Sequence, residues 1–146
     1  MCFRWKRRGD SKEASGYWLL VSPSGGWRFV RWDGTKPVPL TAWTQAGAVR
    51  RGAGARNTVA VVCRGDQIVA LVNGLQVGEV RDDTYLDSGG VGPMSGSSDG
   101  EVAYRNLKID PGVMPPVGVS TPQPLSPGSA RDRDLLQKVL DLSGTK

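Results

Sequence analysis

Three short apolar runs separated by two turn signals constrain the fold of this chain more than any other feature of its sequence. The runs occupy residues 57–64, 67–72 and 75–80 and are rich in valine. Gly65-Asp66 separates the first two runs, and Asn73-Gly74 separates the last two. Asn-Gly is typical of a two-residue hairpin, because a type I′ turn requires positive φ at both central residues. The stretch therefore predicts an antiparallel meander of three strands.

Further strands are expected on the N-terminal side of the meander. Residues 17–22 and 27–32 are rich in aromatic and β-branched side chains and are joined by a glycine-rich turn. Both faces of 27–32 are mixed, so the pattern does not indicate which face is buried. Near the N-terminus, Phe3 and Trp5 alternate with basic residues. This alternation predicts a half-buried strand with both rings on one face.

Shorter segments complete the expected set of strands. Residues 48–50 are expected to form a short strand or edge, and residues 101–109 a closing strand. Pro37 and Pro39 exclude a central strand at their positions, because proline has no backbone donor for the sheet.

Composition supports the same fold class. The chain has 146 residues, 20 of them glycine and 10 proline, and 38% of its residues are hydrophobic. So many turn residues suit an all-β domain and argue against a helical bundle. We therefore predict an all-β, two-sheet antiparallel β-sandwich over residues 1–110.

The chain changes character after residue 110. Residues 111–128 hold most of the prolines, together with glycine and serine, and predict an extended linker. Residues 129–146 predict a short amphipathic helix, with Ser129 as its N-cap and apolar side chains at helical spacing (Leu135, Leu136, Val139, Leu140 and Leu142). A helix this short needs an apolar surface, which the sandwich or a protein partner would supply.

The order of several short motifs points to a known family. They are Asn57-x-Val-x-Val, Gly65-Asp-Gln-Ile, Val72-Asn73-Gly74, Asp82-Asp83, Gly89-Gly-Val-Gly92 and Val102-x-Tyr-x-Asn106-Leu-x-Ile109. In this order they resemble a concanavalin A-like lectin/glucanase β-sandwich, a jelly roll found in secreted bacterial proteins. The likeness covers roughly residues 2–110, taking element spacing as the guide.

The resemblance carries expectations about completeness and function. Family members have further strands before the position of Met1, so the chain resembles a truncated member, or one whose missing edge another chain supplies. Asn57 and Asn106 match fixed positions of the pattern and are expected to bond backbone groups at strand ends. The resemblance implies a non-catalytic accessory module that binds carbohydrate. A structural or protein-interaction domain is the alternative, and a keto-glucoside or other glycoside hydrolase-like domain comes third.

Residue content narrows the possible chemistry. The chain has no histidine, which removes Ser-His and Cys-His nucleophiles and the usual zinc sites. The Glu-x-Asp-x-(x)-Glu strand of catalytic concanavalin-like enzymes is missing, and Glu79 to Asp83 do not match it. Loop aspartates match no calcium-loop spacing. We therefore expect no metal, no cofactor and no catalytic residue. Cys2 and Cys63 are either free or joined in one disulfide bond.

The tryptophans are the strongest candidates for ligand contact. All five lie within the first 43 residues. Exposed indoles stack on sugar rings, while Arg or Asp side chains bond the hydroxyl groups. The expected ligand-contacting set is Trp18, Trp27, Trp32, Trp43, Arg31 and Asp82. The competing interpretation is that most of these indoles belong to the core, because tryptophan carries a large apolar surface.

Charge and hydropathy set the expected partners. The formal net charge of +5 is scattered, apart from a run at residues 6–8, whereas nucleic-acid binding needs a basic face. No apolar run is long enough for a signal peptide or a membrane span. We expect a carbohydrate or protein partner, without nucleic acid or membrane. The sequence as it stands predicts a cytoplasmic protein, or an extracellular or envelope protein if the true N-terminus lies further upstream.

Overall fold

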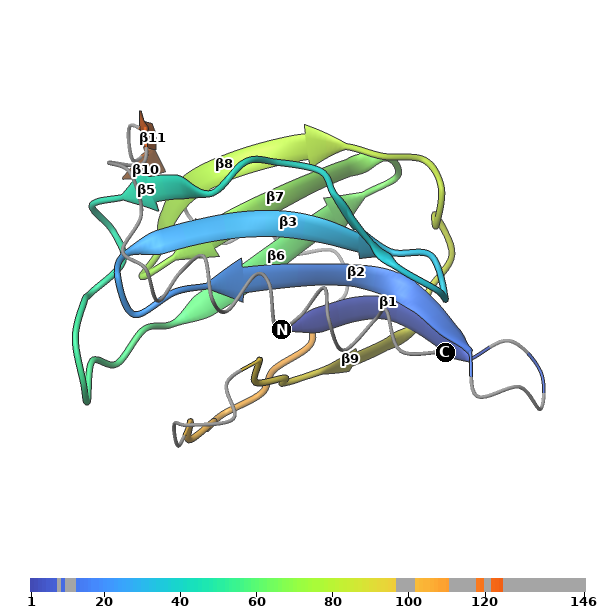
Figure 1. Cartoon of the computed structure of the whole chain (residues 1–146), viewed down its shortest axis with the longest axis horizontal. Helices are drawn as coiled ribbons and strands as arrows, with labels where there is room; N and C mark the ends of the chain where they lie inside the picture. Colours follow the sequence, from blue (N-terminus) through green and yellow to red (C-terminus); the bar gives the residue numbers. More distant parts are fainter. Residues whose placement is uncertain (8, 10–12, 97–101, 111–117, 120–121, 125–146) are drawn as a thin grey trace.

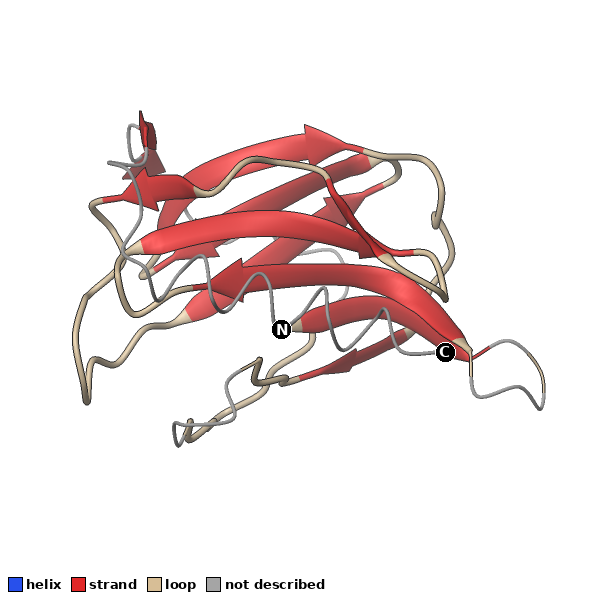
Figure 2. Ribbon diagram, viewed as in Figure 1, coloured by secondary structure: helices blue, strands red, loops and turns tan. Residues whose placement is uncertain are grey.

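The structure is a computed structural model, and it describes residues 1–7, 9, 13–96, 102–110, 118–119 and 122–124. These residues form strands joined by turns and loops, with no helix among them (Figure 2). In chain order the strands are β1 (Cys2–Arg7), β2 (Ala14–Val21), β3 (Gly26–Trp32), β4 (Pro37–Pro39), β5 (Thr44–Ala46), β6 (Val59–Arg64), β7 (Gln67–Val72), β8 (Leu75–Arg81), β9 (Gly90–Gly92), β10 (Gly118–Val119) and β11 (Pro122–Pro124).

The strands make two sheets (Figure 1). Sheet A has the order β11-β5-β3-β2-β1-β9, with β4 also paired to β3, and sheet B has the order β10-β8-β7-β6. Every pairing is antiparallel except that of β10 with β8. The prediction of an all-β fold with two antiparallel sheets is confirmed at this level.

One hydrophobic core joins the two sheets. Sheet A contributes Tyr17, Leu19 and Phe29, and sheet B contributes Ile68 and Val72, all of them fully buried. Alternate residues of a strand point to opposite faces, so every second side chain of β2, β3 and β7 enters this core. Burial of apolar surface between the sheets supplies the main stabilisation of the fold.

The predicted meander is confirmed as β6, β7 and β8. Gly65 has a φ of 54° in the first turn, and Asn73 and Gly74 have φ values of 53° and 82° in the second. The Asn73 side chain also accepts from Thr58 N at 2.9 Å and donates to Ala48 O at 2.7 Å. It donates in addition to Asn57 Oδ1, and Asn57 exchanges two bonds with the backbone of Arg50. These amides fasten the preceding loop to the meander.

A β-bulge in β1 overturns the expected arrangement of its aromatic residues. Arg4 has a φ of 49°, and the register with β2 shifts between Phe3 and Lys6. Phe3 therefore enters the core and stacks on Tyr17. Trp5 lies on the opposite face, where it stacks on Trp18. The extra residue of a bulge breaks the period of two on which the prediction depended.

Two other strand predictions are wrong. Residues 48–50 form a turn and bend, and the strand in this region is β5, which pairs with the first residues of β3. Residues 102–110 form no strand and are exposed, so Asn106, with a φ of 56°, lies in a loop. β4 pairs with β3 alone, in keeping with its two prolines.

The predicted linker and tail lie mostly outside the described residues. Within 111–128, two short strands pair with the sheets: β10 runs beside β8, and β11 runs beside β5. The predicted helix at 129–146 falls entirely outside the described residues.

Cys2 and Cys63 are free thiols, in sheet A and sheet B respectively. Within the described part of the chain, no helix has the length and apolar character to cross a membrane.

Candidate functional site

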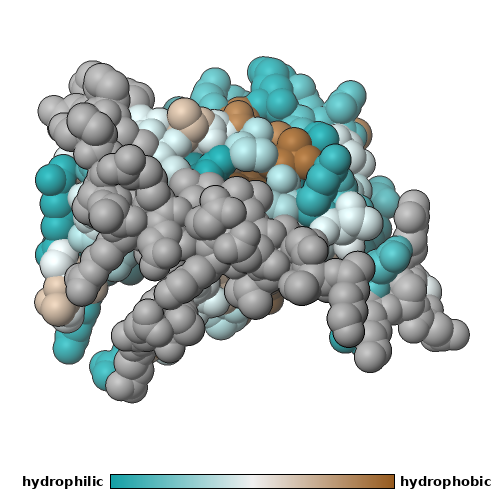
Figure 3. Space-filling view, in the orientation of Figure 1, coloured by the Kyte–Doolittle hydropathy of each residue, from teal (hydrophilic) through white to brown (hydrophobic). Residues whose placement is uncertain are grey.

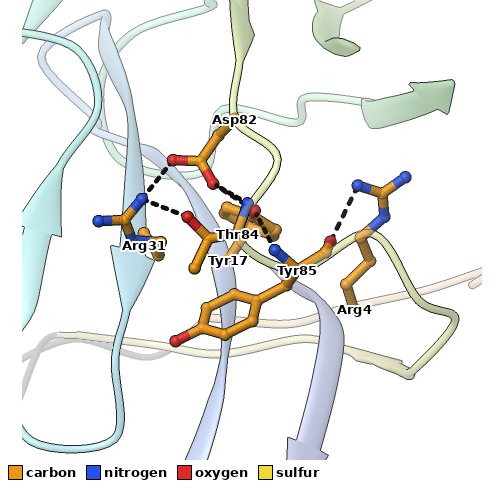
Figure 4. Close-up of polar contacts among 6 residues, drawn as sticks. All are labelled: Arg4, Tyr17, Arg31, Asp82, Thr84 and Tyr85. Carbon is orange, nitrogen blue, oxygen red and sulfur yellow. Dashed lines mark hydrogen bonds and ion pairs between the residues drawn. The ribbon is translucent and has the colours of Figure 1, made fainter. Parts of the chain in front are cut away.

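A network of polar side chains lies where the loop after β8 meets sheet A (Figure 4). Asp82 begins this loop, and its side chain is 8% exposed. Its Oδ1 accepts from the Tyr17 hydroxyl group at 2.6 Å, and its Oδ2 pairs with Arg31 Nη1 at 2.5 Å. Tyr17 and Arg31 are paired residues on β2 and β3. The carboxylate therefore ties two neighbouring strands of sheet A to the end of sheet B.

The loop continues the network. Thr84 N donates to Asp82 Oδ1 at 3.0 Å, and Thr84 Oγ1 accepts from Arg31 Nη1 at 2.7 Å. Tyr85 N donates to the Tyr17 oxygen at 3.0 Å, and the two tyrosine rings pack edge to face. On the other side, the bulge residue Arg4 donates to Tyr85 O at 3.1 Å and to Gly65 O at 2.8 Å. The loop backbone is thereby held at several points.

Electrostatics in this network favour an ionised Asp82 beside a neutral Tyr17. Burial of Asp82 acts to raise its pKa, but hydrogen bonds from Tyr17 and Thr84 and the charge of Arg31 outweigh it, so the pKa is lowered. The pKa of Tyr17 is raised, first by burial and then by its bond to the carboxylate. Both groups keep a fixed protonation state near neutral pH.

A shallow pocket of about 240 Å³ lies beside the network. Its walls come from β1, β2 and the loop after β8, and are lined by Arg4, Lys6, Ser15, Asp83, Thr84, Tyr85, Leu86 and Asp87. Lys6 Nζ and Asp87 Oδ2 form an exposed ion pair of 3.0 Å at its edge. The lining residues thus combine carboxylates, cations and hydroxyl groups with one tyrosine and one leucine.

Trp27, one of the expected ligand-contacting residues, is placed in the core between the sheets. It is 3% exposed, and its ring packs edge to face on Phe29. A Cβ atom at Gly78 of β8 would lie 2.3 Å from Trp27 Cη2, so the indole occupies space that only a glycine leaves open. This ring faces the opposite sheet and has almost no surface left for a ligand.

The other expected tryptophans lie on the outer face of sheet A. Trp18 stacks on Trp5 and on Trp32, with ring centroids 6.2 Å and 5.1 Å apart and interplanar angles of 25° and 20°. Arg28 lies over the ring of Trp43 at 5.7 Å, a cation–π contact. Where described residues are visible in Figure 3, mainly along the upper rim of this view, hydrophilic residues surround smaller hydrophobic areas. The row of indoles uses much of its ring surface for mutual stacking, which leaves less for a sugar.

The structure thus divides the expected set among three places. Arg31 and Asp82 meet in the polar network, Trp18 and Trp32 meet on the outer face of sheet A, and Trp27 lies in the core. Trp43 adjoins the outer face through Arg28.

Several residues of the network and pocket were missed from the sequence. In the sequence, nothing distinguishes Tyr17 from other aromatic residues of a strand, or Arg4 from the other arginines. Asp83 and Thr84 carry a weak signal, because acidic and hydroxyl residues follow a strand there. Nothing in the sequence indicates that this loop meets β1 and β2, since the contacts span more than 60 residues.

The described residues contain no group of three or more acidic or cysteine side chains placed to hold a metal ion. No protein-family model matches the chain, no curated protein matches it and no solved structure matches it. The concanavalin-like assignment therefore stays a prediction from the order of its motifs.

Proposed function

We propose that this chain is a non-catalytic binding module of concanavalin-like type, and that it binds a glycan in the pocket beside the loop after β8. The mixed lining of that pocket is the observation that carries the proposal. Ligand pockets for drug-sized molecules occupy about 300–1,000 Å³ and are mostly apolar. This one is smaller, at about 240 Å³, and polar and apolar atoms contribute to its lining in nearly equal measure. Such a space suits a sugar ring or chain end better than an apolar ligand.

The chemistry of the lining matches a polyhydroxylated ligand. Carboxylates of Asp83 and Asp87 would accept bonds from sugar hydroxyl groups, while Lys6 and Ser15 would donate to sugar oxygens. The exposed Leu86 side chain would offer an apolar surface for C–H groups. Because both signs of charge line the pocket, a strongly anionic or cationic ligand would meet a like charge.

The polar network beside the pocket holds the loop that lines it. Arg31, Asp82 and Tyr17 fix the start of the loop, and Arg4 fixes the backbone at Tyr85. A preorganised site loses less conformational entropy when the ligand binds. In this proposal Arg31 and Asp82 position the loop rather than contact the ligand.

A hydrolytic function fits the network less well. A general acid in glycoside hydrolysis needs a raised pKa, whereas the pKa of Asp82 is lowered. Its oxygens are also occupied by Tyr17, Arg31 and Thr84.

Isothermal titration calorimetry against a panel of soluble oligosaccharides tests the proposal. We expect saturable binding to at least one oligosaccharide, weakened by about tenfold or more in Asp83→Asn, because the lost carboxylate bond is worth on the order of 1.5–3 kcal/mol. Glu79→Gln is the matched control, since it removes one negative charge on β8 away from the pocket lining. Equal binding by both variants would place the ligand elsewhere, and no binding across the panel would refute the glycan proposal.

Tryptophan fluorescence distinguishes the pocket from the outer face of sheet A. No tryptophan lines the pocket, whereas Trp5, Trp18 and Trp32 form a row on that face. Pocket binding should leave acrylamide quenching unchanged. Protection of the indoles by the oligosaccharide would move the site to the outer face.

A protein-interaction module is the second candidate. The observation that favours it is a group of exposed apolar side chains between residues 102 and 109.

A further inference from the structure

Exposed apolar side chains are concentrated in one short segment. Among the described residues, six large hydrophobic side chains are exposed, and four of them lie within residues 102–109. These four are Val102, Tyr104, Leu107 and Ile109, with exposed fractions of 51%, 51%, 59% and 66%. Scattered exposed apolar residues are ordinary, but four such side chains within eight residues favour a role in protein–protein interaction.

The segment has the pattern of a strand with one bulge. Val102 and Tyr104 alternate in one phase, and Leu107 and Ile109 alternate in the other. Asn106 lies between the two pairs and has a φ of 56°, the left-handed conformation of the first residue in one common bulge type. A bulge at Asn106 would bring all four apolar side chains to one face. The opposite face would carry Ala103, Arg105 and Lys108.

Among the described residues, β6 leaves one edge unpaired along its six residues, close to the eight of the segment. In the described part of the chain β6 pairs with β7 alone, at the edge of sheet B. Arg64 and Gln67 flank the two-residue turn, so the even-numbered residues of β6 exchange bonds with β7. The N–H and C=O groups of Val59, Val61 and Cys63 therefore point away from β7. This edge has no proline and one charge, at Arg64, and so lacks most of the features that block strand addition.

The inner face of β6 also lacks full cover. Val59, Val61 and Cys63 pack against the core but are only half-buried. A further strand beside them, with its apolar face inward, would extend the core across this edge.

We propose that residues 102–109 of one copy of this chain add to the β6 edge of a second copy, and that the exchange is reciprocal. The segment does not pair with its own β6 in the structure, and its Tyr104 hydroxyl group bonds to Met94 O of the same chain. Reciprocal addition closes a two-fold dimer with no free copy of either element. Like charges on neighbouring strands destabilise a sheet. The antiparallel orientation is therefore favoured, because it places Lys108 far from Arg64.

Analytical ultracentrifugation of the full chain across a range of concentrations tests the exchange. We expect a monomer–dimer equilibrium whose dissociation constant rises by more than about tenfold in Leu107→Lys, because the new charge would face the core of the partner. Leu107 is 59% exposed, so the substitution costs the monomer little. Ala103→Glu is the control, because it also adds a charge to the segment, on its opposite face and at the end that lies nearest Arg64 in the antiparallel orientation, and so should leave the dimer intact.

Hydrogen exchange followed by NMR locates the contact. In the dimer the amides of Val59, Val61 and Cys63 should exchange slowly, and dilution should make them fast. The amides of Ala60 and Val62 already bond to β7 and should stay protected throughout. A monomer at all concentrations, a dimer that Leu107→Lys leaves unchanged, or fast exchange at Val61 within the dimer would each overturn the proposal.

Discussion

The Tyr17 hydroxyl group serves two partners at once. It donates to Asp82 Oδ1 and accepts from Tyr85 N, and so joins β2 to both the first and a later residue of the loop. A buried donor or acceptor that loses its partner costs about 1–3 kcal/mol.

Tyr17→Phe should therefore lower the free energy of unfolding by about 1–3 kcal/mol, because it leaves Tyr85 N without its acceptor. Urea denaturation followed by far-UV circular dichroism measures the change. Tyr104→Phe is the control, since that hydroxyl group is on an exposed residue and bonds only to Met94 O among the described residues. Equal losses of unfolding free energy in the two variants would show that the Tyr17 hydrogen bonds stabilise the fold no more than an exposed hydroxyl group does.

Asp82 should make stability depend on acidic pH. Its pKa in the folded chain is below the ordinary value of 3.8, so the unfolded chain binds the proton more readily. Its contribution is therefore complete above the unfolded pKa and is lost as pH falls through the folded pKa. We expect Asp82→Asn to flatten the fall in unfolding free energy below about pH 4. Urea midpoints measured at several pH values check this, and parallel curves for the two proteins would contradict it.

The sequence alone predicts the conformation of a residue where the signal is local. Asn73-Gly74 predicts its own turn, because the conformation depends on two adjacent residues. The left-handed conformation of Arg4 gives no such signal, since arginine is not favoured there. The partnership of Arg31 with Asp82 depends on how two sheets meet, which no local pattern encodes.

At the scale of elements, the packing of β3 against β8 depends on a glycine, which has no side chain. Trp27 of β3 projects into the core over Gly78 of β8, and a Cβ atom at position 78 would lie 2.3 Å and 2.4 Å from two ring carbons. Gly78 has no positive φ, so its role is to leave space rather than to permit a turn.

Gly78→Ala should accordingly destabilise the chain by about 1–3 kcal/mol, the usual cost of an overpacked core. Gly47→Ala is the control, because nothing lies within 4 Å of its Cβ position and its φ is not positive. Thermal unfolding would show a lower midpoint for the first variant alone. An unchanged midpoint for Gly78→Ala would mean that the indole moves aside freely.

The element scale also shows where strand prediction fails. Residues 102–109 have apolar alternation on both sides of Asn106, yet they form no strand. A strand needs a partner for its backbone groups as well as a pattern. Conversely, β11 contains two prolines and still pairs with β5, because it lies at an edge of sheet A.

At the scale of the whole molecule, one core makes the two sheets interdependent. Ile68 of sheet B is fully buried in the same cluster as Phe29 and Tyr17 of sheet A. Neither sheet covers its inner face alone, so we expect them to unfold together.

Ile68→Ala provides the test, because sheet B contains no tryptophan and all five indoles lie within residues 5–43. The variant should lose about 2–5 kcal/mol, and the urea midpoint from tryptophan fluorescence should fall as far as that from circular dichroism. A fluorescence midpoint that stays at the wild-type value would show that sheet A is stable without sheet B.

The contact between Gly78 and Trp27 also restricts how this sequence can change over time. A methyl group at position 78 and an indole at position 27 compete for the same volume, so the two positions are not free to vary separately. A lineage that first replaced Trp27 by a smaller ring could later accept alanine at position 78. The reverse order passes through an overpacked intermediate that is less stable by about 1–3 kcal/mol. Among diverged descendants of this chain, a side chain at position 78 should accompany the loss of the indole at position 27.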